Sequence, residues 1–112
     1  MTASQSKVGQ SKVEMTRLEA RLGELALRGE TLTYGALAQE MGWRVADLTG
    51  ALETLMEIDT ANGRPLRAAL CEGRMAGGLP ARGFFDKAAE LGFDISDPAQ
   101  FVEKHRRALS GW

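Results

Sequence analysis

Several residue types that carry chemistry are scarce in this sequence. Its 112 residues include one cysteine, Cys71, and one histidine, His105. A single cysteine excludes an intramolecular disulfide and a cysteine-ligated metal cluster within one chain. A lone histidine with no second histidine or cysteine beside it argues against a zinc site. We therefore expect no metal and no other cofactor.

Long apolar runs and a strong net charge are missing too. No apolar stretch approaches the ~18 residues that a membrane-spanning helix needs, and residues 1–11 lack the apolar centre of a secretory signal. The formal net charge is −1, far from the basic balance of a dedicated nucleic-acid binder. We expect a cytoplasmic protein of bacterial type with no membrane partner. Residues 1–11 are predicted to be a flexible leader, and residues 12–112 a single domain.

The sequence does contain a series of amphipathic segments with helical spacing. Thr33 is a suitable N-cap for one of them, Gly29 and Gly42 are plausible stops, and Asp97 with Gln100 forms a capping box. Helices are therefore predicted over residues 12–28, 34–41, about 45–58, about 84–91 and from 98 onward.

Two short segments between these helices favour extended structure. "ETLT" (30–33) is either a short strand or a link, and "LRAALC" (66–71) alternates weakly before a glycine-rich stretch. The second segment and the stretch after it predict a β-hairpin or one strand with a loop. The predicted fold is mainly α (α+β): a winged-helix-like helix-turn-helix with a short hairpin and two additional C-terminal helices.

Several short motifs occur in an order that resembles a known family. They are "TYGALAQEMG" (33–42), "RPL" (64–66), Cys71, a glycine-rich loop and "GFFDKAAEL" (83–91). Residues 31–92 thereby resemble the DNA-binding C-terminal domain of the O6-alkylguanine-DNA alkyltransferases and the alkyltransferase-like proteins. The resemblance implies a winged-helix fold whose wing follows the cysteine. It also implies that Tyr34 contacts a phosphate. The nearest candidate in this chain for the arginine with which the family helps to extrude a base is Arg44.

The reactive block of that family is not preserved. The family has Pro-Cys-His-Arg, whereas this chain has Leu70-Cys71-Glu72-Gly73-Arg74. A cysteine nucleophile needs a neighbouring base or a lowered pKa, and an adjacent carboxylate such as Glu72 raises a thiol pKa. We therefore expect no enzymatic activity and interpret Cys71 as a small apolar residue.

The charges divide unevenly along the chain. Residues 31–59 carry one cation, Arg44, against the acids Glu40, Asp47, Glu53, Glu57 and Asp59. An acidic helix is repelled by phosphates, which provide most of the affinity of nucleic-acid binders. Residues 60–89 carry the cations Arg64, Arg67, Arg74, Arg82 and Lys87 against Glu72 and Asp86. Wings with arginines bind the minor groove or the DNA backbone.

Two functions remain open. The first is a non-enzymatic winged-helix module that binds duplex DNA through Tyr34, Arg44, Arg64, Arg67, Arg74 and Arg82. The second is a protein-interaction or oligomerisation module on the same scaffold, because acidic helices and a basic loop suit a partner of opposite charge or a second copy. Solvated loop charge with no partner is the plain alternative for the arginines.

Overall fold

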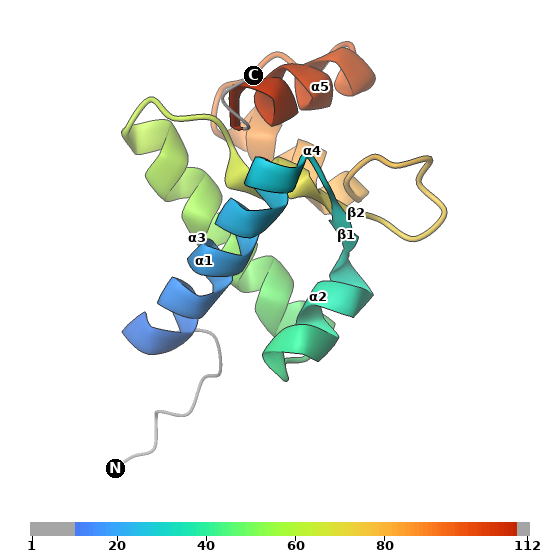
Figure 1. Ribbon diagram of the computed structural model, residues 1–112. Helices are drawn as coiled ribbons and strands as arrows, with labels where there is room; N and C mark the ends of the chain where they lie inside the picture. The colour runs from blue at the N-terminus through green and yellow to red at the C-terminus, as the bar shows by residue number, and fades with distance from the viewer. Residues whose placement is uncertain (1–10, 110–112) are drawn as a thin grey trace.

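The computed structural model describes residues 11–109 and is mainly helical (Figure 1). The predicted leader, apart from Ser11, lies outside the described residues, as do residues 110–112. In chain order the elements are α1 (Lys12–Arg28), β1 (Leu32–Thr33), α2 (Tyr34–Met41), α3 (Val45–Ala61), the 3-10 turn η2 (Arg67–Leu70), β2 (Cys71–Glu72), α4 (Arg82–Glu90) and α5 (Pro98–Leu109). In the described part, no helix is long and apolar enough to cross a membrane.

Local capping signals set the helix ends where the sequence predicts them. The Thr33 hydroxyl accepts a hydrogen bond from the Ala36 amide at 3.1 Å, and the Asp97 carboxylate accepts one from the Gln100 amide at 3.2 Å. Gly29 and Gly42 follow α1 and α2 in the left-handed conformation, with φ of 64° and 76°, which glycine adopts without steric cost. The predicted helices are confirmed, although α3 extends to Ala61.

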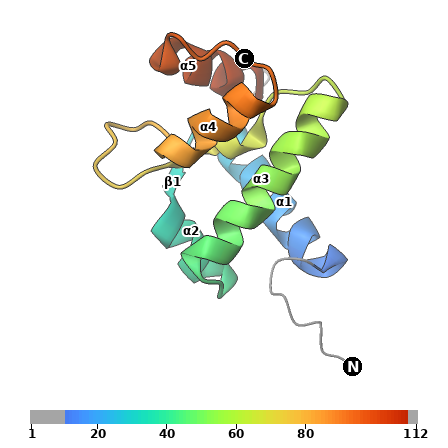
Figure 2. The ribbon, with the colours of Figure 1, turned by 180° about the vertical axis from the view of Figure 1, so that it is seen from behind.

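The core is built around the short turn η2, which lies between α1 and α3, and α5 covers one end of the molecule (Figures 1 and 2). All three of these helices contact η2. Ala68 and Ala69 of this turn are buried, and their small side chains let the backbone approach its neighbours closely. The largest core side chains that are almost fully inaccessible are Leu18, Leu22, Leu25, Leu37, Leu48, Leu55, Met56 and Leu66.

Of the two alternatives predicted for the segment around Cys71, the β-hairpin is wrong, and one strand followed by a loop is confirmed. β2 pairs in parallel with β1, in the register Leu32 with Cys71 and Thr33 with Glu72. The chain after β2 forms a loop, residues 73–81, that closes on itself through a 2.8 Å hydrogen bond from the Gly73 amide to the Leu79 carbonyl. The backbone cannot extend into a returning strand there, because Met75, Gly77 and Gly78 all have positive φ angles (57°, 63° and 86°).

A buried carboxylate fixes η2 to α3. Asp59 is 0% exposed. It accepts hydrogen bonds from the Arg67 backbone amide at 3.0 Å and from Arg67 Nη2 at 2.7 Å. The same guanidinium donates from Nη1 to Glu19 of α1 at 2.9 Å. One arginine therefore links three segments of the fold.

Helix α5 is attached through two consecutive side chains. His105 Nδ1 accepts a hydrogen bond from the Leu66 amide at 2.9 Å, just before η2. Arg106 donates from Nε to the Ala69 carbonyl at 2.7 Å and from Nη2 to the Gly78 carbonyl at 2.8 Å. These bonds give a side-chain partner to one backbone amide and two backbone carbonyls in the segment from Leu66 to Gly78.

Asp59→Ala is expected to lower the free energy of unfolding by about 3–5 kcal/mol, because it removes the buried partner of the Arg67 amide and leaves the guanidinium with Glu19 alone. Glu19→Ala removes the more exposed partner, whose side chain is 40% accessible, and is expected to cost about 1 kcal/mol or less. Urea unfolding at neutral pH measures both. Equal losses in the two variants would contradict the central role of Asp59.

Candidate nucleic-acid interface

Loop 73–81 projects from one side of the molecule, next to β1 and β2, in both views (Figures 1 and 2). Two long-range hydrogen bonds hold its end. Arg106 of α5 binds the Gly78 carbonyl, and the Tyr34 hydroxyl of α2 accepts from the Ala81 amide at 3.1 Å. Inside the loop, the Ala76 amide donates to the Gly73 carbonyl at 3.2 Å. The second half of the loop is therefore anchored to α2 and α5.

The outer part of the loop presents a cation beside an apolar side chain. Arg74 is exposed, and Met75 is 97% exposed. Met75 is the one non-glycine residue of the described chain with a positive φ, 57°. A bulky side chain is rare in this conformation, and strained positions of this kind concentrate at functional sites.

Arg82 adds a second cation at the base of the loop, where α4 begins. Its side chain is 92% exposed and lies 3.8 Å from Asp86, which is itself 70% exposed. An ion pair that is this exposed to solvent and this long contributes little to the stability of the fold. Arg82 is therefore available to a phosphate or to another anion.

The other predicted arginines do not join these two. Arg67 is bound to Asp59 and Glu19 in the interior. Arg64 belongs to the turn after α3, and this turn lies on the opposite side of the molecule from loop 73–81 (Figures 1 and 2). Arg44 caps the start of α3 and pairs with Asp47 at 3.2 Å. The six predicted residues therefore do not form one surface.

The acidic balance of residues 31–59 is largely neutralised by cations from elsewhere in the chain. Glu40 pairs with Arg21 at 2.7 Å and Glu57 with Lys87 at 2.6 Å. Asp59 and Asp47 have the partners already described. Of the five acids, Glu53 alone forms no ion pair within residues 11–109. The repulsion of phosphates that the sequence suggests is correspondingly weaker.

Tyr34 supports the loop. Burial raises the pKa of its hydroxyl to about 12, against a smaller opposite effect of the hydrogen bond from Ala81. The hydroxyl therefore stays protonated at neutral pH and can still donate one hydrogen bond. The cavity that Tyr34 lines together with α3 and α4 has a volume of about 60 Å³, well below the ~300–1,000 Å³ of typical ligand pockets.

Cys71 lies in the core under β1. It is 0% exposed, and burial raises the pKa of its thiol to about 12, although Arg106 acts in the opposite direction. The neighbouring Glu72 carboxylate accepts a hydrogen bond from the Thr31 hydroxyl. The thiolate, which is the reactive form, is therefore strongly disfavoured at neutral pH.

Two residues of this site, Arg106 and Met75, could not be recognised from the sequence. Arg106 lies within "KHRR" (104–107), a run that is typical of a solvated last helical turn, and nothing local marks one member as buried. Met75 is inconspicuous in a glycine-rich stretch, and its exposure depends on how the loop folds. Within the described residues, no group of three or more His, Cys, Asp or Glu side chains could hold a metal ion.

Comparison with known protein families, with curated proteins and with solved structures finds no match for this chain.

Native protein at pH 8 is expected to leave Cys71 unlabelled by a disulfide-exchange reagent over the time in which urea-unfolded protein reacts completely. Burial and the raised thiol pKa both keep the nucleophile out of reach. Release of the coloured thiol product measures the rate. Labelling of native protein as fast as that of unfolded protein would show that Cys71 is accessible.

Proposed function

We propose that the protein is a non-enzymatic, winged-helix-like module that binds duplex DNA through loop 73–81 and the adjoining Arg82. One observation carries this proposal: the loop presents an exposed arginine, Arg74, directly beside the almost fully exposed Met75, and Arg82 adds a second exposed cation where α4 begins. Proteins that bind the minor groove use arginines along its edges and insert apolar side chains such as methionine between base steps. Loop 73–81 offers both kinds of group within nine residues.

The anchoring of the loop supports the same proposal. Arg106 and Tyr34 fix its backbone before any partner arrives, and a segment that is already ordered loses less conformational entropy on binding. The sequence order of helix, strand, helix, helix and basic loop, and the resemblance to the alkyltransferase DNA-binding domain, point in the same direction. Helices α2 and α3 are then a scaffold for the loop, with Arg44 at their edge.

The proposed module has no catalytic activity. A thiol with a pKa of about 12 and a cavity of about 60 Å³ beside Tyr34 are poorly suited to alkyl transfer from a base. The block Leu70-Cys71-Glu72 offers no histidine to activate the thiol. Binding without chemistry fits these residues better.

A protein partner is the second candidate, and the same loop favours it. Methionine and arginine are both enriched in protein–protein interfaces, and Arg74 lies directly beside Met75. Light scattering over a range of salt concentrations separates the two functions. A dimer that dissociates as salt rises, in protein that does not bind DNA, supports the second candidate.

Fluorescence anisotropy with a labelled duplex at about 50 mM salt tests DNA binding, since electrostatic affinity is greatest at low salt. Arg74→Ala and Arg82→Ala are each expected to weaken binding and to reduce the slope of log K against log salt by about 1. Met75→Ala is expected to weaken binding without changing the slope, because it removes an apolar contact.

Arg64→Ala is the matched control, because it removes an exposed arginine on the opposite side of the molecule. It is expected to leave both the affinity and the slope unchanged. Wild-type protein that does not bind at low salt, or equal losses in Arg64→Ala and Arg74→Ala, would rule out the loop as the DNA-binding element.

A further inference from the structure

A second cleft is formed without any residue of loop 73–81. It has a volume of about 590 Å³ and runs between the turn after α3, the link from α4 to α5, and one face of α5. This volume is within the range of pockets that hold small organic ligands. No part of the proposed DNA interface lines it.

One wall of the cleft is made of three aromatic rings. Phe93 lies 5.4 Å from Phe101 between ring centroids, and His105 lies 5.5 Å from Phe93 and 4.6 Å from Phe101. All three side chains are only partly buried. A wall of this kind suits a flat ring, which packs on aromatic faces or edges.

His105 also gives the wall a directed donor. Its Nδ1 accepts from the Leu66 amide, and burial, followed by the charge of Lys104, lowers the pKa of the imidazole. The neutral ring therefore carries its proton on Nε2. Nε2 has no hydrogen-bond partner among residues 11–109.

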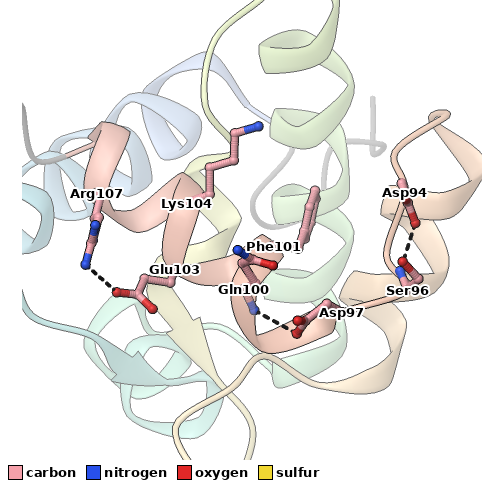
Figure 3. Close-up of a pocket in the computed structure, with 8 residues that line it drawn as sticks. All are labelled: Asp94, Ser96, Asp97, Gln100, Phe101, Glu103, Lys104 and Arg107. Carbon is pink, nitrogen blue, oxygen red and sulfur yellow. Dashed lines mark hydrogen bonds and ion pairs between the residues drawn. The ribbon is translucent and has the colours of Figure 1, made fainter.

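Two cations stand at the rim. Arg64 and Lys104 are exposed and line the cleft, and neither forms an ion pair within the described chain. Figure 3 shows Lys104 and Phe101 extending together from α5, while Glu103 is paired with Arg107 at 2.8 Å. The acid that lines the cleft, Asp94, already accepts a hydrogen bond from the Ser96 amide at 3.0 Å.

A neighbouring hollow of about 760 Å³ at the start of α5 (Figure 3) differs from this cleft. Most of its polar side chains already have partners. The Asp97 carboxylate accepts a hydrogen bond from the Gln100 amide, and Glu103 pairs with Arg107. These side chains are engaged in shaping the helix end, and the two other groups that could contact a ligand, Phe101 and Lys104, also line the cleft.

We propose that the cleft of Phe93, Phe101 and His105 binds a nucleoside monophosphate. Its base packs against the aromatic wall, His105 Nε2 donates to a polar atom of the base or sugar, and Arg64 and Lys104 hold the phosphate. Arginine and lysine are the usual phosphate-binding side chains. Thr60 also lines the cleft, and its hydroxyl is the one buried side-chain polar atom of the described residues without a partner. Such an atom calls for a ligand or a water.

Calorimetric titration of the full chain with adenosine and uridine monophosphates tests the proposal. At least one of them is expected to bind. The matching nucleoside is expected to bind about tenfold more weakly, because it lacks the phosphate, and inorganic phosphate more weakly than either. Arg64→Ala and Lys104→Ala are each expected to weaken the nucleotide about tenfold. Both residues are exposed, so the variants retain the fold.

Arg74→Ala, on the opposite side of the molecule, is the control and is expected to bind the nucleotide like wild type. The His105 ring signals in an NMR titration are expected to shift with the nucleotide in wild type and in this control. Three results would overturn the proposal: no binding of either nucleotide at about 10 mM, inorganic phosphate binding as tightly as the nucleotide, or unchanged affinity in both rim variants. None of these results bears on loop 73–81, so the two sites succeed or fail separately.

Discussion

The ion pair between Asp59 and Arg67 is the interaction on which the other features depend. The fully buried carboxylate fixes both the backbone amide and the guanidinium of Arg67, and so sets where η2 leaves α3. From that point the chain passes Ala68 and Ala69 and enters the pairing of β2 with β1. A buried pair of this kind contributes little net stability but is costly to break. Its main effect here is to define a unique path for the chain.

Helix α5 contributes to two separate surfaces of the molecule, loop 73–81 and the cleft beside the turn after α3. Its consecutive residues His105 and Arg106 both bind backbone groups around η2, but they contribute to different surfaces. Arg106 continues outward to Gly78 and fixes loop 73–81. His105 faces the cleft between α5 and the turn after α3. The appended helix therefore supports the proposed DNA-binding loop on one side and the proposed nucleotide cleft on the other.

Local features of the fold could be predicted from the sequence, and long-range pairings could not. The capping side chains of Thr33 and Asp97 bind amides only three residues later, so a short stretch of sequence is enough to predict each helix start. Arg67 instead meets Glu19, 48 positions away, and Glu57 meets Lys87, 30 positions away. Both segments consequently carry less unpaired charge than their sequence totals suggest. The hairpin failed for a related reason, since the partner of β2 is the preceding strand β1.

The central claim is that loop 73–81 is a preformed element that contacts nucleic acid while α2 and α3 serve as its scaffold. Titration of isotope-labelled protein with a short duplex, followed by amide chemical shifts, tests this claim most directly. The account predicts the largest shifts at residues 74–82, including Met75 and Arg82, and little change along the exposed face of α3. Shifts concentrated on α3 around Glu53, with loop 73–81 unchanged, would contradict it.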